Sequence, residues 1–320
     1  MELPPALRMA VDRALSGIPA RELGAAAAAL SQRYRDERRG HAPHVATRQD
    51  AFAYIATRLP ATYAAVRAAF AATADAIAAF APRTALDAGA GPGTALWAAA
   101  ECWPSLAEAT LLEVSPIFLG LGQELSAGAD LPPAIWRGVD IAAGRIEDAP
   151  RDLVTAAYVL NELAPETRPS VVERLWSATT GVLIIVEPGT PAGWQCIAGA
   201  RQQLIEAGGH VVAPCPHDLA CPLRSPDWCH FAQRVARSRQ HRLAKGAEVP
   251  WEDEKFSYVA VSRNPAASAS SRIVARPRKA GGHVTLKLCL PDGTAENKVF
   301  SRRDGDAFKQ ARRADWGETL

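Results

Sequence analysis

The sequence predicts an α/β protein with a doubly wound parallel sheet, preceded by helices and followed by a small β unit. Between residues 83 and 213, short apolar, β-like runs alternate with longer runs at helical spacing. A glycine-rich turn directly follows the first of these β-like runs, as in sheets that bind a ligand at their strand ends. The 320 residues are 48% hydrophobic and 22% charged, which excludes wholesale disorder and provides a sizeable core.

The predicted elements fall into three regions. Residues 1–80 are expected to be helical, and Pro60 separates two helices of this region. Residues 81–263 are expected to form the main domain, with an insertion at 214–250 before its last strand. Residues 264–320 are expected to form a linker and a small basic β unit. The expected strands are 84–88, 109–114, 134–139, 153–160, 182–187, 210–213, 256–262, 283–290 and 298–302, and the expected helices of the main domain are 94–101, 117–126, 168–178 and 192–207.

The strongest local motif is LDAGAGPGT, at residues 86–94. Gly89, Gly91 and Gly93 stand at alternate positions between the first strand and the next helix, where the backbone must turn tightly and approach a ligand closely. The GxGxG spacing is typical of class I S-adenosylmethionine methyltransferases and differs from the GxGxxG of dinucleotide dehydrogenases. The alternative is a structural glycine turn in another kind of α/β protein.

Polar residues at the strand ends complete the predicted cofactor site. Asp87 suits a cationic cofactor with an amino group, and Glu113, after the second strand, suits two ribose hydroxyls. Asp140 is expected beside adenine, although a plain surface acid fits it equally well. Asn161 follows the fourth strand, where the methyl group would lie. Because neither an Asn/Asp-Pro-Pro-aromatic motif nor a cysteine occurs there, the sequence supports cofactor binding better than turnover and assigns no catalytic residue.

The six cysteines divide into two groups. Cys102 and Cys196 are isolated on predicted helices, and we expect them to pack in the core. Disulfides are not expected in a cytoplasmic chain. The other four have a layout for metal ligation by thiolates, either around a 4Fe–4S cluster, whose spacing varies, or around zinc, although the paired CxxC of zinc ribbons is missing. These four are Cys215, Cys221, Cys229 and Cys289.

The net charge of +2 conceals two unlike parts of the chain. Residues 1–222 carry 17 basic and 23 acidic side chains, whereas residues 223–320 carry 19 basic and 11 acidic ones. A basic C-terminal part fits structured RNA, and a solvated basic surface fits equally well. No run is apolar enough for a membrane span, and the first thirty residues lack a signal-peptide pattern. We therefore expect a cytoplasmic protein with no membrane partner.

Further motifs carry a resemblance to one family. They are YIATRLPATY at 54–63, the glycine loop, YVLNEL at 158–163, EPGT at 187–190, WCHF at 228–231 within the three-cysteine cluster, EDEKFSY at 252–258, and Cys289. From about residue 45 onward, the chain resembles the methyltransferase-like proteins of small-ribosomal-subunit assembly, known from mitochondria and with bacterial relatives. The resemblance implies binding of small-subunit rRNA, S-adenosylmethionine at the glycine loop, and a 4Fe–4S cluster at the four cysteines.

The sequence thus predicts an S-adenosylmethionine-dependent, rRNA methyltransferase-like assembly factor of the small ribosomal subunit, acting as a monomer. Two alternatives remain open. One is a non-catalytic rRNA-binding assembly factor that keeps the methyltransferase fold. The other is a zinc-stabilised small-molecule methyltransferase without a ribosomal role.

Overall fold

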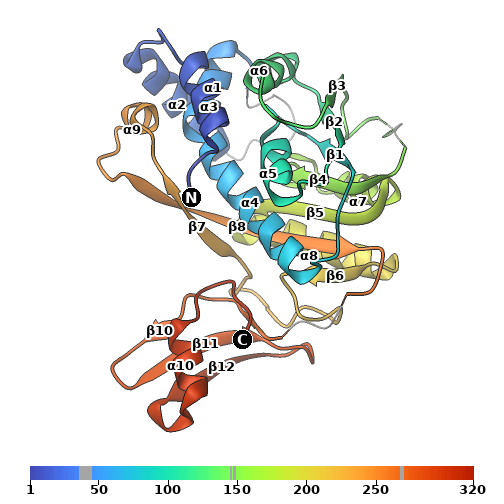
Figure 1. Ribbon diagram of the computed structural model, residues 1–320, viewed down its shortest axis with the longest axis vertical. Coiled ribbons are helices and arrows are strands. Elements are labelled where there is room, and N and C mark those ends of the chain that lie inside the picture. The colour runs from blue at the N-terminus through green and yellow to red at the C-terminus, as the bar shows by residue number, and fades with distance from the viewer. Residues whose placement is uncertain (36–44, 145, 147–148, 267–269) are drawn as a thin grey trace.

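The computed structural model describes residues 1–35, 45–144, 146, 149–266 and 270–320. Its centre is a mixed sheet whose strands lie in the order β3-β2-β1-β4-β5-β8-β6 (Figure 1). Strands β1 to β5 pair in parallel, while β8 runs antiparallel to both β5 and β6. This order, with one reversed strand near the edge, is that of the class I methyltransferase fold that the sequence predicts. The strands are β1 (Thr84–Ala88), β2 (Glu108–Glu113), β3 (Ala134–Gly138), β4 (Arg151–Ala157), β5 (Thr179–Pro188), β6 (His210–Ala213) and β8 (Trp251–Ser262).

Helices cover both faces of the sheet. Along β5, Val182 and Ile184 join the core beneath α4, α5 and α6, while Leu183 and Ile185 join the core beneath α7 and α8. Burial on both faces explains why this strand reads as a continuous apolar run. The helices are α4 (Leu59–Ala76), α5 (Thr94–Cys102), α6 (Pro116–Ser126), α7 (Arg168–Ser177) and α8 (Pro191–Glu206).

The N-terminal region is helical, as the sequence predicts. It contains α1 (Pro5–Ala14), α2 (Ala20–Arg35) and α3 (Arg48–Thr57), and α3 contacts the start of α4. A capping box begins α3: the Thr47 hydroxyl accepts from the Asp50 amide at 3.1 Å, and the Asp50 carboxylate accepts from the Thr47 amide at 3.0 Å. Pro60 lies in the first turn of α4, where its missing N–H leaves no bond unmade.

The insertion before β8 contains regular structure that the sequence analysis does not predict. After a loop at residues 214–230, it forms β7 (Phe231–Ala236) and α9 (Arg239–Lys245). Strands β7 and β8 make an antiparallel hairpin, and α9 at its tip packs on α2 and α3 (Figure 1). The insertion therefore joins the edge of the sheet to the N-terminal helices. In the predicted linker, residues 267–269 lie outside the described residues.

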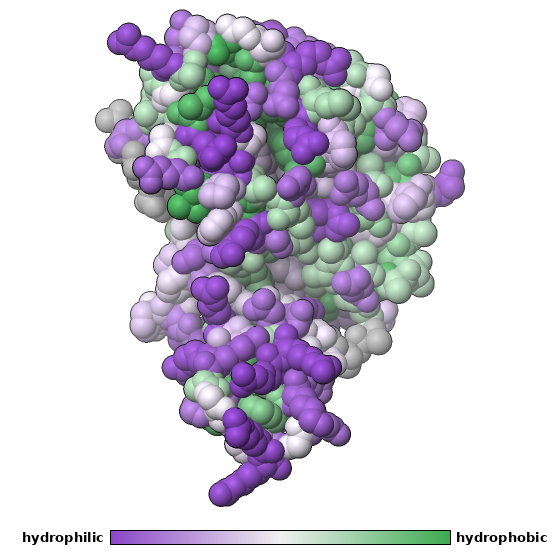
Figure 2. Space-filling view, turned by 60° about the vertical axis from the view of Figure 1, so that its left-hand side comes forward, coloured by the Kyte–Doolittle hydropathy of each residue, from purple (hydrophilic) through white to green (hydrophobic). Residues whose placement is uncertain are grey.

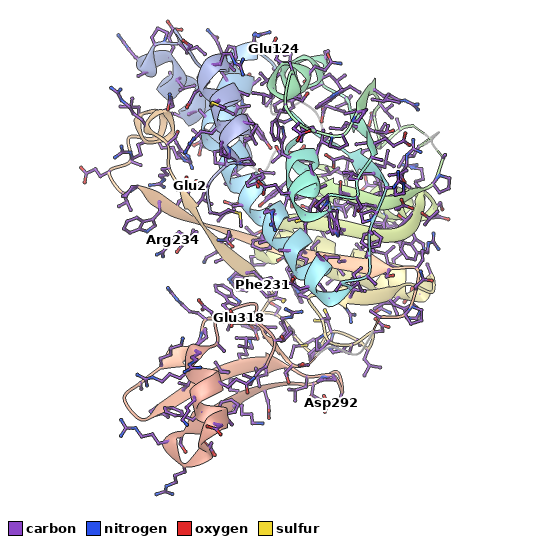
Figure 3. The ribbon with its side chains drawn as sticks, viewed as in Figure 1. Glu2, Glu124, Phe231, Arg234, Asp292 and Glu318 are labelled. Carbon is purple, nitrogen blue, oxygen red and sulfur yellow. The ribbon has the colours of Figure 1, made fainter. Side chains whose placement is uncertain are left out.

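A C-terminal unit, residues 272–320, has a small core of its own, formed by residues such as Ile273, Leu286 and Phe300. Figure 2 shows its surface as largely hydrophilic, and Figure 3 places Phe231 and Glu318 where the unit meets the rest of the chain. Among the described helices, none combines the length and apolar content that crossing a membrane requires. The unit contains β9 (Arg272–Ile273), β10 (Arg278–Lys279), β11 (His283–Cys289), β12 (Ala295–Ser301) and α10 (Asp306–Arg313).

Candidate functional site

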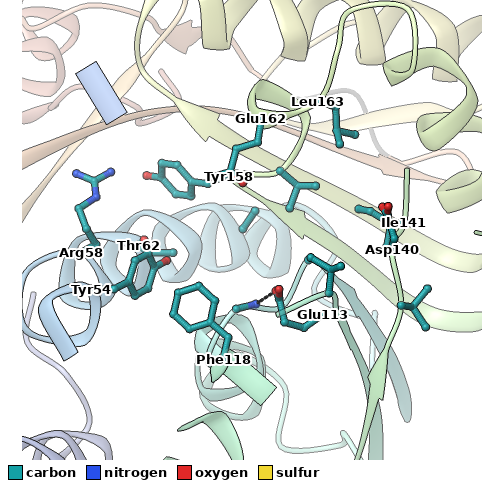
Figure 4. Close-up of a pocket in the computed structure, with 16 residues that line it drawn as sticks. Tyr54, Arg58, Thr62, Glu113, Phe118, Asp140, Ile141, Tyr158, Glu162 and Leu163 are labelled. Atoms are coloured by element: carbon teal, nitrogen blue, oxygen red, sulfur yellow. Dashed lines mark hydrogen bonds between the residues drawn. The ribbon is translucent and has the colours of Figure 1, made fainter. Parts of the chain in front are cut away.

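A pocket of about 180 Å³ opens at the carboxyl ends of β1, β2 and β4 (Figure 4). This is the edge at which open α/β sheets bind ligands. The glycine loop and Glu113 form one side, and Asp140 and Ile141 after β3 form another. The remaining lining residues come from α3, α4, α6 and the segment after β4. Those labelled in Figure 4 are Tyr54, Arg58, Thr62, Phe118, Tyr158, Glu162 and Leu163.

The glycine loop requires glycine at each of its three positions. Gly89, Gly91 and Gly93 have φ angles of +69°, +53° and +81°, in the left-handed region that other residues rarely adopt. A Cβ on Gly89 would collide with Val159, and one on Gly93 would lie 2.7 Å from the Trp136 ring. Nothing lies within 4 Å of a Cβ built on Gly91, so the loop presents bare backbone to the pocket at this position.

Glu113 ties the glycine loop to the end of β2. Its Oε2 accepts from the Gly91 amide at 2.8 Å, and its Oε1 accepts from the Ser115 amide at 2.8 Å (Figure 4 shows the first bond). Burial raises the pKa of this carboxyl, and the backbone hydrogen bonds oppose that rise. Each carboxylate oxygen has a second lone pair, so Glu113 is placed to accept hydrogen bonds from a ligand as well.

Three further carboxyls surround the site. Glu162 is accessible to solvent but stands inside the concave pocket, where desolvation, and then the charge of Glu113, raise its pKa to about 7. Behind it, the wholly buried Glu187 accepts from the amides of Leu160 (2.7 Å) and Asn161 (3.2 Å), and burial raises its pKa to about 8. The third is Asp140, an exposed lining residue whose Oδ1 accepts from the Ala142 amide.

Three predicted site residues, Asp87, Gly93 and Asn161, are not among those that line the pocket. Asp87 is buried beneath the glycine loop, where its Oδ1 accepts from the Thr155 hydroxyl at 2.7 Å. Its Oδ2 is buried and has no hydrogen-bond partner among the described residues, and burial raises its pKa to about 7. Asn161 lies next to the lining residue Glu162, and its amide is engaged by Glu187.

Tyr158 has the one positive φ, +61°, among the described non-glycine residues. It follows β4 directly and lines the pocket, and its hydroxyl donates to Glu254 on β8 at 2.9 Å. Backbone strain of this kind is retained where the surroundings enforce it, and it is concentrated at functional sites. The sequence analysis does not name Tyr158 as a site residue. The motif YVLNEL at 158–163, used there only for the family resemblance, is the signal that contains it.

The N-terminal helices supply a side of the pocket that the glycine motif does not indicate. Tyr54 of α3 packs edge-on against Phe118 of α6 at a ring-centroid distance of 5.0 Å. Arg58 lies between α3 and α4, and Thr62 follows on α4. These three helical residues belong to the motif at 54–63, which sequence reasoning used only as a family resemblance.

All four predicted ligand cysteines line a second cavity, of about 30 Å³. Three come from the loop after β6, and Cys289 comes from β11 of the C-terminal unit. All six cysteines of the chain are free thiols. Burial raises the pKa values of Cys215 and Cys229, and it raises that of Cys289 to about 12. Without a bound cation, these thiols are therefore held in the neutral form.

The donor set of this cavity fits a metal centre of thiolates. Apolar residues such as Ile197, Leu223 and Val274 fill most of the remaining surface of the cavity. Within the described residues, no three His, Cys, Asp or Glu side chains are close enough to hold a single metal ion. A tetrahedral zinc ion draws its sulfurs to about 3.8 Å from one another. A cuboidal cluster also takes four thiolates and holds them further apart.

Comparison with known proteins gives sequence relatives that share most of this chain. Human METTL17, a mitochondrial ribosome assembly protein, is 32% identical, over 83% of this chain and 61% of its own length. The Schizosaccharomyces pombe mitochondrial protein Rsm22-cox11 tandem protein 2 is 23% identical, over 73% of this chain and 38% of its own. The chain therefore spans about three fifths of METTL17 and less than two fifths of the yeast protein.

Solved structures with a partly similar arrangement include two methyltransferases. Magnesium protoporphyrin IX methyltransferase from Synechocystis PCC 6803, with bound S-adenosylmethionine, has a TM-score of 0.41 and 16% identity, covering 73% of this chain and 91% of that one. A putative RNA methyltransferase from Pyrococcus horikoshii has a TM-score of 0.40 and 12% identity, covering 61% and 80%.

The family assignment comes from the sequence. A family model described as mitochondrial small ribosomal subunit Rsm22 matches residues 48–320. That match includes the glycine loop, the residues that line the pocket and all four cysteines of the second cavity. Because this match covers most of the chain, the chain belongs to the Rsm22 family.

Proposed function

We propose that this chain is an S-adenosylmethionine-binding, methyltransferase-like assembly factor of the small ribosomal subunit, which contacts rRNA and holds a 4Fe–4S cluster. The observation that carries the cofactor proposal is the group of carboxyls at the glycine-loop pocket. Glu113, Glu162 and Asp140 line it, and Arg58 is the basic side chain among its described lining residues. A sulfonium and an ammonium group, both cationic, match this excess of acid.

Each residue has a definite part in the proposed cofactor site. Glu113 holds the glycine loop in place and accepts from the ribose hydroxyls, and Gly91 allows close approach to the backbone. Asp87, beneath the loop, would act on the amino end of the cofactor through its charge or through a water molecule bound to its unpartnered Oδ2. Asp140 and Ile141 flank the adenine, and Asn161 would lie near the methyl-bearing end.

Bound S-adenosylmethionine would supply an electrophilic methyl group, for which alignment with a nucleophile provides much of the rate. Glu162 is placed at the opening with a pKa of about 7, and is therefore suited to accept a proton from an incoming acceptor. No cysteine is among the described lining residues, so the pocket offers no thiol for cytosine-C5 chemistry. The second candidate function, a non-catalytic rRNA-binding assembly factor that keeps the methyltransferase fold, requires no such thiol.

Cys215, Cys221, Cys229 and Cys289 are the proposed cluster ligands. The support is their convergence on one largely apolar cavity from two distant parts of the chain. The cluster would join the C-terminal unit to the main sheet, adding to the ion pair between Lys287 and Asp227 at the same junction. A zinc-stabilised small-molecule methyltransferase is the alternative, which metal analysis distinguishes.

The proposed rRNA contact rests on the family and on charge. The surface of the C-terminal unit is hydrophilic (Figure 2), and its exposed basic side chains suit phosphate contacts. The expected consequence is RNA binding that weakens steeply with salt. The predicted cytoplasmic location stays a prediction, since the relatives carry mitochondrial names. The exposed basic residues are Arg276, Arg278, Lys279, Lys298, Arg302, Arg303, Lys309, Arg312 and Arg313.

Anaerobically purified full-length protein tests these proposals together. We expect calorimetry to detect S-adenosylmethionine binding, and chemical analysis to find about four iron atoms per chain. Crosslinking in cells is expected to enrich small-subunit rRNA. Undetectable cofactor binding, a colourless zinc protein, or crosslinks without small-subunit enrichment would each contradict the corresponding part. If Glu113→Ala abolishes cofactor binding while ribosome maturation proceeds normally, the non-catalytic alternative replaces the enzyme.

A further inference from the structure

Two arginines are buried beside the thiol cavity without an acidic partner. Arg201 of α8 is 4% exposed and Arg272 of β9 is 7% exposed. None of the ion pairs between described residues includes either of them. Burying a charge is costly unless an opposite charge lies near it, and no carboxylate in the described part of the chain forms an ion pair with either guanidinium.

The hydrogen bonds of these arginines go to backbone carbonyls that surround the cysteines. One amino group of Arg201 donates to the carbonyls of His217 (2.7 Å) and Leu219 (2.8 Å), between Cys215 and Cys221 in sequence. Arg272 donates through Nε to the Pro214 carbonyl at 2.8 Å and through Nη1 to the Gly317 carbonyl at 2.7 Å. Both guanidiniums are therefore fixed against the loop that carries three of the four thiols, and carbonyl dipoles alone leave their charge uncompensated.

Both arginines adjoin the residues that line the cavity. Arg272 donates to the carbonyl of Pro214, a lining residue that directly precedes Cys215. Arg201 also lines the cavity itself. The cavity thus combines an apolar surface, which opposes ionisation of the thiols, with fixed positive charge, which offsets part of the cost of forming thiolates there.

His217 extends this arrangement to the fourth cysteine. Its Nδ1 lies 3.4 Å from an Arg201 amino group, which can only donate, so Nδ1 acts as the acceptor. The neutral ring then carries its proton on Nε2, which lies 3.4 Å from Cys289 Sγ. The sulfur from the C-terminal unit therefore receives a hydrogen bond from a ring that Arg201 orients.

We propose that Arg201 and Arg272 are the counter-charges of an anionic four-thiolate metal centre in this cavity. The inference rests on the proposed function, because it presumes that the four cysteines hold a centre. Four thiolates around a 4Fe–4S core with two positive charges, or around one zinc ion, leave a net charge of minus two, which two guanidiniums balance. The arginines are positioning residues: they stabilise the charge of the centre without bonding to the metal.

The test separates charge from hydrogen bonding at the two positions in the full-length, anaerobically purified protein. Arg201→Gln and Arg272→Gln keep a donor but remove the charge, whereas Arg201→Lys and Arg272→Lys keep the charge. Arg263→Gln is the matched control, since Arg263 also donates to carbonyls, those of Thr179 and Trp176, away from the cavity. Iron loss to a chelator and the midpoint potential of the cluster are measured in each variant.

We expect each Gln variant to lose iron about tenfold faster than the wild type and to have a more negative midpoint potential, because a lost positive charge disfavours the more anionic reduced state. The Lys variants and Arg263→Gln should behave like the wild type. Gln variants with wild-type iron loss and potential would overturn the inference. So would Lys and Gln variants that fail equally, in folding or in iron retention, because that result indicates a purely structural role.

Failure of the proposed function gives a different result. A wild-type protein that contains zinc and no iron rejects the cluster, and the chelator assay on zinc then decides the inference with the same variants. A wild-type protein that binds neither metal rejects both. Gln variants that do not fold, beside folded and metal-loaded Lys variants, would support the counter-charge role.

Discussion

The glycine-loop pocket and the thiol cavity are built with opposite electrostatics. The first is lined by carboxyls and backbone at the ends of parallel strands, and burial raises the pKa values of Glu113 and Glu162. The second is largely apolar and lined by four cysteines, with two buried guanidiniums beside it. An acidic pocket suits a cationic ligand, and an arginine-flanked set of thiols suits an anionic centre. The two sites of this chain thus suit ligands of opposite charge.

The two sites also differ in how the chain assembles them. Residues between 54 and 163 line the pocket, and they come from the N-terminal helices, α6, and the ends of the first four strands with the loops that follow them. The cavity combines α8, the loop after β6, β8 and the C-terminal unit. The pocket can therefore form without the C-terminal unit, whereas the cavity is complete only when that unit is in place. Ligand loss at the cavity should affect the whole chain, and changes at the pocket should remain local.

The largest expected effect follows from replacing one thiol of the cavity. Cys229→Ser removes one of four proposed ligands, and we expect iron content to fall nearly to zero. Because metal binding is coupled to folding, the free energy of unfolding should fall by on the order of 5 kcal/mol. Iron analysis and urea denaturation measure the two effects. Cys102→Ser, at the end of α5 and outside the cavity, is the control and should keep its iron. Equal iron in both variants would contradict the role of Cys229.

Sequence reasoning predicted the pocket and the cavity to different extents. The glycine loop is a local signal, because positive φ angles within a strand-turn-helix impose a residue type at each position. Strand alternation placed Glu113 and Asp140 beside it. The sequence predicts Asp87 and Asn161 in the site, whereas in the structure they lie next to the lining residues but do not line the pocket. Spacing gives the position of a residue along the strand but not whether its side chain faces the opening.

The remaining features depend on contacts distant in sequence. Tyr54 and Thr62 reach the pocket because α3 and α4 pack across the strand ends, which no local pattern reports. Strand β7 and α9 were missed because the insertion was interpreted through its cysteines and its basic residues. Arg201 and Arg272 are far apart in the sequence, and no pattern in the residues that flank either of them indicates that its charge is buried.

A backbone change tests how rigidly the pocket is built. Gly89→Ala adds a Cβ that collides with Val159 at a φ of +69°, and we expect it to cost about 3 kcal/mol of stability and to weaken cofactor binding. Gly128→Ala is the matched control: its φ is +72°, with nothing within 4 Å of the new Cβ. That variant should show only the backbone cost, about 1 kcal/mol, and normal binding. Equal urea midpoints for the two variants would exclude the close contact.

Charge at the pocket is tested by Glu113→Gln. The amide keeps one acceptor oxygen but loses the charge that strengthens hydrogen bonds to ribose hydroxyls, so affinity for S-adenosylmethionine should fall about tenfold to a hundredfold. Calorimetry measures the change. Glu108→Gln, at the exposed other end of β2, alters the net charge equally and should leave affinity unchanged. The thiol cavity should keep its iron in both variants, as expected for independent sites.

The smallest expected effect is the pH dependence of cofactor binding contributed by Glu162. Its pKa of about 7 means that the carboxyl is largely protonated at pH 6 and ionised at pH 8. A cationic ligand favours the ionised form, so binding at pH 6 must release a proton and is weaker. Affinity should therefore rise with pH in this interval, by less than tenfold per unit for one group.

The Glu162→Gln variant lacks this contribution, so its affinity should vary less with pH and lie below the wild-type value at pH 8. The ligand's own amino group titrates equally in both proteins, so calorimetry at several pH values isolates the difference. Identical pH profiles would place the Glu162 charge outside the binding site.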